Sequence, residues 1–385
     1  MKKTIINSDF KLGILGGGQL GKMLVLAAQN WDLNTWILDA SADFPAASAC
    51  SHFVEGSFKN YDDVYAFGKQ VDVITIEIEH VNTEALLQLE AEGKIVHPRP
   101  AALNIIKDKG LQKQFYAQHG LPTSPFRLYE SLEAIKAAIA SGELQYPFVQ
   151  KTRTAGYDGQ GVALIRSEAN AHKLLNAPSM VEDLVDIEKE LAVQVTRNPS
   201  GQVVAFPPVE MEFNPVANLV ECLICPANIS KEVGEKATQL AQAAIEAYDI
   251  CGLLSVEFFL SKSGEVLINE VAPRPHNSGH HTIEGNHCSQ FQQHLRAVLD
   301  WPLANTDIRM PAVMVNLLGA EGHKGTARYE NLRDCLAVDG AHLHLYGKNM
   351  TKPFRKMGHA TVLDPDLNEA RRRAQFIKDT LNIIA

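Results

Sequence analysis

Two apolar runs near residue 260, each with one carboxylate inside it, predict a β-hairpin. The first run, residues 253–260, contains Glu257, and the second begins at Leu267 and contains Glu270. The polar residues 261–264 between them fit a four-residue turn. Pairing Leu260 with Glu265 would place Glu257 opposite Ile268. Glu270 then follows two positions later, as a diagonal neighbour on the same face.

Two carboxylates among Leu, Val and Phe side chains are costly to bury unless a cation balances their charge. Oxygen ligands without cysteine or paired histidine favour Mg²⁺, with Mn²⁺ as the alternative. The hairpin therefore predicts a metal site at Glu257 and Glu270. The competing interpretation is that this face is wet and both glutamates are ordinary surface charges.

The amino-terminal region has the pattern of a parallel α/β sheet. A buried strand at 11–16 leads through glycines 16–21 into a helix, and a second strand ends at Asp39. This spacing satisfies the dinucleotide-binding fingerprint, although its physical content is a phosphate at a helix N-terminus. NAD and other phosphorylated small molecules both remain candidates. A strand at 72–78 places Glu77 and Glu79 at its carboxyl end, where such sheets bind ligands, unless they are exposed edge acids.

After a basic helix predicted over 107–120, strand pairs with helices to one side indicate an α+β unit. The strand 146–151 carries Lys151 and precedes the glycine-rich turn 154–161, after which a strand covers 162–165. Backbone amides of such a turn can cover a triphosphate. The turn lacks the Walker A ending and is followed by a strand, and a plain hairpin is the alternative.

The strand 179–185 has acids near its end, and a free Glu182 together with the Leu184 backbone could contact an adenine edge. A hairpin across 198–201 carries Glu190 and Glu210, whose roles the pattern leaves ambiguous. A helix beginning at the N-cap Ser230 precedes the carboxylate hairpin, and another covers 288–299.

The last part of the chain predicts strands at 310–319 and 342–348 and a helix over 368–380. Between the second strand and this helix, a basic loop at 346–359 stands out because the 385-residue chain has a net charge of −9. An anionic ligand or a solvated charged loop would explain it.

The overall composition is that of an ordinary globular protein. The acidic balance gives no electrostatic case for a nucleic-acid partner. No apolar run is long enough to span a bilayer, and the first residues lack a signal-peptide pattern. A single CxxC, Cys222 and Cys225, is better explained by packing than by zinc. We expect a reduced, soluble, cytoplasmic protein.

Four segments carry a family resemblance: GGGQLGKM, KTRTAGYDGQG, INEVAPRPHNSGH and FRKMGH. Together they resemble the N5-carboxyaminoimidazole ribonucleotide synthetases of purine biosynthesis, within the ATP-grasp superfamily. The resemblance implies an ATP-grasp fold of mixed α/β and α+β class. It also implies a Rossmann-like domain at 1–105, an ATP-grasp domain with its lid at 106–304, a small β-rich domain at 305–385, and a homodimer.

The resemblance also assigns roles by position. Mg²⁺ would be held by Glu257 and Glu270, and catalysis would involve Arg274, His276 and Lys348. The residues implied at ATP are Lys109, Lys151, Gly156, Tyr157, Asp158, Gly159, Gln160, Gly161, Val162, Glu182, Asp183, Leu184, Val185, Glu190, Glu210, Asn269 and Glu270. Those implied at the ribonucleotide are Gln19, Leu20, Glu77, Tyr157, Asp158, Asn277, Lys348, Arg355 and Lys356.

The implied reaction joins bicarbonate to 5-aminoimidazole ribonucleotide at the expense of ATP, through carboxyphosphate. Arg274 and His276 directly follow the metal strand, where they could hold bicarbonate. A formate-dependent glycinamide ribonucleotide transformylase is the nearest rival. An NAD-dependent oxidoreductase is a distant one. A non-catalytic nucleotide sensor is disfavoured because Lys151 and both metal glutamates are present.

Overall fold

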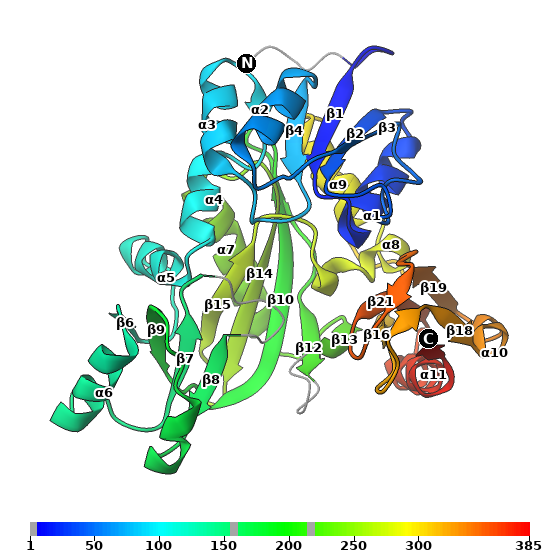
Figure 1. Ribbon diagram of the computed structural model, residues 1–385. Helices are drawn as coiled ribbons and strands as arrows, with labels where there is room; N and C mark the ends of the chain where they lie inside the picture. Colours follow the sequence, from blue (N-terminus) through cyan, green and yellow to red (C-terminus); the bar gives the residue numbers. More distant parts are fainter. Residues whose placement is uncertain (1–5, 155–160, 214–219) are drawn as a thin grey trace.

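The computed structural model describes residues 6–154, 161–213 and 220–385. It has an amino-terminal α/β part, a central antiparallel part and a carboxy-terminal β-rich part, as the sequence predicts (Figure 1). Within the residues described, each helix is too short or too polar to span a lipid bilayer.

Five parallel strands form the amino-terminal sheet in the order β3-β2-β1-β4-β5. Their bounds are β1 Lys11–Leu15, β2 Asn34–Asp39, β3 His52–Glu55, β4 Val73–Ile76 and β5 Ile95–Val96. The connecting helices are α1 Gln19–Gln29, α2 Tyr61–Lys69 and α3 Thr83–Ala91. The predicted parallel sheet is confirmed. Strand β3 was not predicted, because its four residues include no buried position.

Two helices, α4 (Pro100–Ile106) and α5 (Lys109–Gln118), replace the single helix predicted over 107–120. Asp108 separates them, because its carboxylate accepts hydrogen bonds from the amides of Gly110 and Leu111 and so caps α5. A four-stranded antiparallel sheet follows in the order β6-β9-β7-β8, with helix α6 (Leu132–Ser141) beside it. The strand bounds are β6 Phe126–Tyr129, β7 Phe148–Thr152, β8 Val162–Ile165 and β9 Ser179–Asp183.

Three strands of a nine-stranded sheet form the platform for the site: β10 (Ile187–Arg197), β14 (Gly252–Ser261) and β15 (Val266–Ala272). One face of this platform packs on α5 and on α7 (Lys231–Ala247), mainly through aliphatic side chains. Helix α7 begins where predicted, since Ser230 accepts a hydrogen bond from the Val233 amide. Side chains of a strand alternate between its two faces, so every second residue of β10, β14 and β15 points away from α5 and α7.

The β14–β15 hairpin pairs Leu260 with Val266, one position away from the predicted register. If this register continued without a bulge, Glu257 would lie opposite Asn269, and Glu270 would be on the other face. A bulge after Glu257 shifts the pairing, so that Glu257 lies directly opposite Glu270. The prediction that Glu257 and Glu270 share one face is confirmed. The prediction that they are diagonal neighbours is wrong, because they lie directly opposite each other.

The nine-stranded sheet continues into the carboxy-terminal part in the order β12-β13-β16-β21-β19. The bounds are β12 Val209–Phe213, β13 Val220–Cys225, β16 Ala312–Leu318, β19 Ala341–Leu345 and β21 Lys356–Leu363. The basic loop predicted over 346–359 is too long, because Lys356 begins a strand that is paired on both sides. The final helix α11, Leu367–Thr380, agrees with the prediction.

Shorter elements complete the described chain. They are β11 Val203–Ala205, α8 Thr282–Gly285, α9 Gln290–Val298, β17 Gly325–Thr326, β18 Arg328–Glu330, α10 Leu332–Leu336, β20 Met350–Thr351, β22 Asn382–Ile384 and the 3₁₀ turns η1 Glu168–Lys173 and η2 Asn277–Gly279.

Cys222 and Cys225 both lie in β13, three positions apart. Side chains at this spacing point to opposite faces of a strand. The two thiols accordingly belong to different hydrophobic clusters, as expected if they serve packing.

Candidate active site

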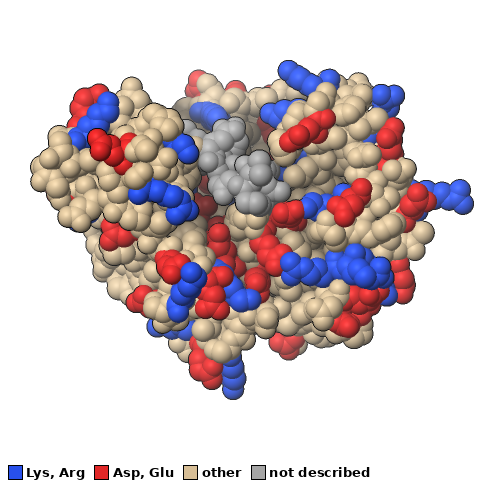
Figure 2. Space-filling model, turned by 90° about the horizontal axis from the view of Figure 1, so that it is seen from below, with Lys and Arg blue, Asp and Glu red and all other residues tan. Residues whose placement is uncertain are grey.

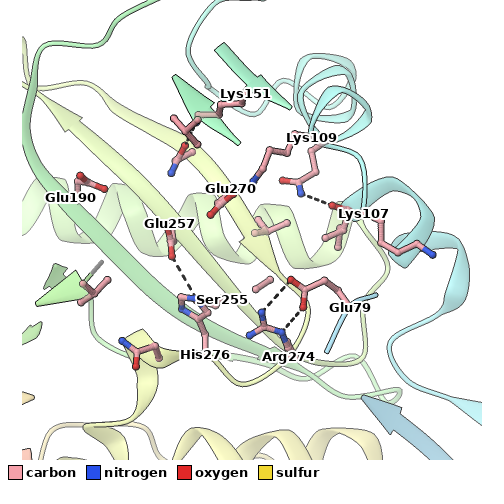
Figure 3. Close-up of a pocket in the computed structure, with 18 of the residues that line it drawn as sticks. Glu79, Lys107, Lys109, Lys151, Glu190, Ser255, Glu257, Glu270, Arg274 and His276 are labelled. Atoms are coloured by element: carbon pink, nitrogen blue, oxygen red, sulfur yellow. Dashed lines mark hydrogen bonds and ion pairs between the residues drawn. The ribbon is translucent and has the colours of Figure 1, made fainter. Parts of the chain in front are cut away.

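A cavity of about 840 Å³ opens between the central platform and the small sheet β6–β9, with the amino-terminal sheet at one end. All three parts of the chain line it, for example Gln19 at the start of α1, Lys151 on β7, Glu257 on β14 and Lys356 on β21. Figure 3 shows side chains from several of these elements pointing toward a common space.

Glu257 and Glu270 face this cavity from adjacent strands, and Glu190 of β10 lies on the same face (Figure 3). Burial raises the pKa of the Glu257 carboxyl, and the charges of Glu270 and Glu190 raise it further. Lys109, which forms an ion pair with Glu270, lowers the pKa of that carboxyl. The side chain of Glu257 is only 14% exposed, so it is not an ordinary surface charge. A bound cation would relieve the repulsion between the carboxylates.

The oxygen donors here fit Mg²⁺. Glu257 and Glu270 contribute carboxylates, and Asn269 lines the same cavity with its amide oxygen bonded to Lys151. Mg²⁺ typically takes one or two carboxylates and completes its shell with water and substrate phosphates. Among the described residues, no group of three or more His, Cys, Asp or Glu could hold a metal ion. The fit therefore depends on oxygens supplied by a bound polyphosphate.

A buried charge network fixes Lys151 at this site. Its Nζ donates to Asn269 Oδ1 at 2.9 Å and lies 2.6 Å from Glu182 Oε2. The other oxygen of Glu182 is 2.6 Å from Lys113 Nζ and accepts a hydrogen bond from Ser124 Oγ at 2.5 Å. Burial opposes ionisation of Glu182, but Lys151 and Lys113 outweigh it and hold its pKa at about 2.

Lys113 was not predicted, because nothing in the local sequence distinguishes it from the neighbouring Lys107 and Lys109, which are only partly buried. Glu182 was predicted to be free, whereas its carboxylate is paired with two lysines. The next residues, Asp183, Leu184 and Val185, line the cavity and leave the end of β9 as a candidate edge for adenine.

Arg274 and His276 line the cavity just past β15. Arg274 makes a two-point ion pair with Glu79, with distances of 2.6 and 3.1 Å (Figure 3). Burial opposes ionisation of Glu79, but Arg274 outweighs it and lowers the pKa to about 2. Burial, followed by the charge of Arg274, lowers the pKa of His276 to about 3, so the ring is neutral. Its Nε2 lies 3.7 Å from Glu257 Oε1.

Protein carboxylates already occupy the amides of the first glycine turn. Asp39 accepts from the Gly17 amide at 2.7 Å, and Glu77 accepts from the amides of Gly18 and Gly21 at 3.1 and 3.0 Å. Burial raises the pKa of Glu77 to about 7. Gly16 has a φ of +106°, and a Cβ there would collide with the Glu77 side chain. The turn is therefore closed to a dinucleotide pyrophosphate, which argues against the NAD interpretation.

Other predicted residues divide into those the fold brings to the cavity and those it does not. Gln19, Leu20, Glu77, Asn277, Lys356, Lys109 and Val162 also line the cavity. Gly161 is described but lies outside the lining residues. Gly156, Tyr157, Asp158, Gly159 and Gln160 lie outside the described residues.

Glu210 is not brought to the cavity. It pairs across the sheet with Leu191, whose side chain is in the core, and its carboxylate is 2.8 Å from Lys189. Residues paired in this way share a face, so Glu210 points away from Glu190.

Lys348 and Arg355 do not line the cavity either. Lys348 Nζ donates to the Lys356 carbonyl at 2.7 Å, and Arg355 donates to the Met350 carbonyl at 2.6 Å. The face seen in Figure 2 carries acidic and basic side chains side by side, without a uniformly positive surface. The cations suited to anionic substrates are instead those inside the cavity.

Comparisons with known proteins match all three parts of the chain. Three protein-family models match segments of the chain. They describe a ribonucleotide synthetase preATP-grasp domain at residues 10–107, an ATP-grasp domain at 114–291 and a phosphoribosylaminoimidazole carboxylase C-terminal domain at 312–373. The phosphoribosylaminoimidazole carboxylase of Candida glabrata is 38% identical over 95% of this chain. The chain spans 65% of the length of that relative.

Relatives of full matching length are also found. The N5-carboxyaminoimidazole ribonucleotide synthase of Brucella melitensis is 38% identical over 95% of this chain and 99% of its own. The crystal structure of N5-carboxyaminoimidazole ribonucleotide synthetase from Thermotoga maritima superposes with a TM-score of 0.90, at 39% identity, over 98% of this chain and 99% of that one. The Aspergillus clavatus synthase in complex with ADP and 5-aminoimidazole ribonucleotide gives a TM-score of 0.88 at 34% identity, over 97% and 98% of the two chains.

The fold and the cavity thus define an ATP-grasp enzyme, with its cavity between two antiparallel sheets. The chain belongs to the N5-carboxyaminoimidazole ribonucleotide synthase family.

Proposed function

We propose that this chain carboxylates 5-aminoimidazole ribonucleotide with ATP and bicarbonate, releasing ADP, phosphate and N5-carboxyaminoimidazole ribonucleotide in purine biosynthesis. One observation carries the proposal. The bulged hairpin aims Glu257 and Glu270 into a cavity that also holds Lys151 at one end and Arg274 and His276 at the other. The family supports the same reaction.

At the ATP end, Mg²⁺ held by Glu257 and Glu270 would neutralise charge on the phosphates. Lys151 and Lys109 lie beside these carboxylates and would stabilise the charge on the transferred phosphoryl group. The adenine would lie along 183–185, with Glu190 near the ribose. On the geometry above we leave Glu210 out of this site.

At the other end, Arg274 and His276 would hold bicarbonate, which is a poor electrophile until it is phosphorylated. The ribonucleotide would lie across Gln19, Leu20 and Asn277, with Lys356 at its phosphate. Lys348 would act indirectly, by holding the carbonyl of Lys356, and Arg355 would hold the Met350 carbonyl. The nearby carboxylate of Glu77 is bound to the glycine turn and would shape the pocket floor.

We also propose the division into domains 1–105, 106–304 and 305–385, a homodimer and a cytoplasmic location. The three matched family segments support the division, although the β13–β16 pairing joins the last two domains in one sheet. The unpaired state of all six cysteines is compatible with a reducing compartment.

The test is substrate-dependent release of ADP from Mg²⁺-ATP. Turnover with 5-aminoimidazole ribonucleotide plus bicarbonate is the expected result. Turnover only with glycinamide ribonucleotide plus formate would transfer the chain to the rival transformylase activity. ATP binding without turnover on either pair would indicate a nucleotide sensor, and nicotinamide binding independent of Mg²⁺ would indicate an oxidoreductase.

A further inference from the structure

Ser278, two positions later in the chain, contacts the ring of His276. The Ser278 amide donates to His276 Nδ1 at 3.4 Å, which makes the ring the cap of the η2 turn. The Ser278 hydroxyl lies 2.8 Å from the same nitrogen. Both contacts converge on Nδ1, while the other ring nitrogen points toward Glu257.

These contacts determine which ring nitrogen carries the proton. A neutral imidazole has one N–H donor and one acceptor nitrogen. Because a backbone N–H can only donate, Nδ1 must be the acceptor, and the proton is on Nε2. The 3.7 Å between Nε2 and Glu257 Oε1 is too long for a hydrogen bond. Among the described residues, the Nε2–H group is therefore available to a ligand oxygen in the cavity.

Ser278 is itself fixed by buried partners. Its side chain is fully buried, and its Oγ accepts from Gln194 Nε2 at 2.9 Å. Ser255 Oγ is further away, at 3.3 Å. With one lone pair used by Gln194, the hydroxyl proton is directed to the shorter contact, which is His276 Nδ1.

A second buried side chain fixes the backbone of His276. Gln290 is fully buried, and its Oε1 accepts from the His276 amide at 2.9 Å while its Nε2 donates to the His276 carbonyl at 2.8 Å. This pair of bonds is the pattern that a neighbouring strand would supply. His276 is thus restrained in both backbone and ring.

We propose that Ser278 is a positioning residue that keeps the Nε2–H of His276 aimed into the cavity. His276 then acts as a hydrogen-bond donor to an oxygen of bicarbonate or of its phosphorylated form, and not as the base that takes the amine proton. This inference rests on the proposed function for the identity of the anion, and only on the geometry for the tautomer.

The tautomer can be tested without turnover. Long-range ¹⁵N–¹H correlation spectra of histidine-labelled protein distinguish a protonated from an unprotonated ring nitrogen, and comparison with His276→Gln assigns the signals. We expect His276 to carry its proton on Nε2 in the wild type and to lose this fixed state in Ser278→Ala. A wild-type ring protonated on Nδ1 would overturn the proposal, whatever the enzyme turns out to carboxylate.

Kinetics test the donor role. Ser278→Ala should lower kcat by about tenfold to a hundredfold with little change in the KM for ATP, because a displaced donor misplaces the anion. The control Thr196→Val removes a fully buried hydroxyl from β10, outside the lining of the cavity, and should leave kcat unchanged. An active wild type with an unaltered Ser278→Ala would refute the positioning role.

Two variants of His276 distinguish a hydrogen-bond donor from a general base. Glutamine places an N–H near the position of Nε2 but cannot act as a base, whereas leucine supplies neither group. We expect His276→Gln to retain at least about ten times the kcat of His276→Leu, since one lost donor to a developing charge costs a hundredfold or more. Equal loss in both variants of an active enzyme would favour a base. An inactive wild type would instead reject the proposed function and leave the tautomer result standing.

Discussion

Arg274 and Glu79 form a two-point ion pair between segments 195 positions apart, one following β15 and the other following β4. The pair crosses from the central sheet to the amino-terminal sheet at the wall of the cavity. A guanidinium bound at two points to a carboxylate has a defined orientation. Glu79 therefore sets the direction in which Arg274 faces the anion proposed beside it.

Replacing Glu79 with glutamine should impair turnover more than nucleotide binding. We expect kcat for the ribonucleotide reaction to fall by about tenfold to a hundredfold, because Arg274 would lose its alignment. The KM for ATP should change little. Steady-state ADP release measures both, with Glu133→Gln on the exposed side of α6 as the control. An unchanged kcat would show that Arg274 needs no partner.

The same pair should make stability depend on pH in the acid range. The pKa of Glu79 is about 2 in the folded protein, below its ordinary 4.5, so folding favours the ionised carboxylate. Its contribution is complete above the unfolded pKa and is lost as pH falls toward the folded one. The difference in free energy of unfolding between wild type and Glu79→Gln should therefore shrink between about pH 6 and pH 3. Urea denaturation at several pH values measures this difference. A constant difference would contradict the ion pair.

Glu270→Ala should abolish turnover and leave the fold intact, since the residue lies at the cavity and outside the core. We expect kcat to fall at least about a hundredfold, because the metal and Lys109 would both lose a partner. Glu265→Gln, an exposed carboxylate at the turn of the same hairpin, is the matched control. Persistent Mg²⁺-ATP turnover in Glu270→Ala would disprove the metal assignment.

Lys113→Met should destabilise the protein strongly. Lys113 is 1% exposed and neutralises the buried Glu182, so its removal leaves that carboxylate with less compensating charge. Breaking a buried pair in this way costs about 3–5 kcal/mol. Urea unfolding of this variant and of Lys136→Met, on the exposed face of α6, gives the comparison. Equal stability of the two variants would show that Lys151 alone suffices for Glu182.

Lys356→Ala should weaken binding of the ribonucleotide selectively. Lys356 lines the cavity, whereas Arg355 is turned to the Met350 carbonyl. We expect the apparent KM for the ribonucleotide to rise about tenfold or more in Lys356→Ala, and less in Arg355→Ala, with the KM for ATP unchanged. A larger effect from Arg355→Ala would restore the contact implied by the family resemblance.

Local patterns were sufficient for the elements that carry the site. Ser230 predicts the start of α7, and the apolar runs around Glu257 and Glu270 predict their strands. The inserted residue at the bulge was not predictable, because an apolar run does not reveal where a strand gains a residue. The two glutamates nevertheless share a face, since the error in register and the bulge offset one another.

Contacts between distant segments could not be predicted. Nothing near Glu79 indicates Arg274, and nothing near Lys113 indicates Glu182. Glu190 and Glu210 looked equivalent in sequence, yet the pairing of Glu210 with Leu191 turns it to the other face. Such outcomes depend on sheet order and register, which one sequence does not specify.

The antiparallel pairing of β13 with β16 has a consequence for truncated forms of the protein. A protein truncated near residue 304 would leave backbone N–H and C=O groups along one edge of β13 unpaired. Such an exposed strand edge promotes aggregation. The tail is thus not an appendage that can be cut away. It covers one edge of a sheet whose other end lines the cavity.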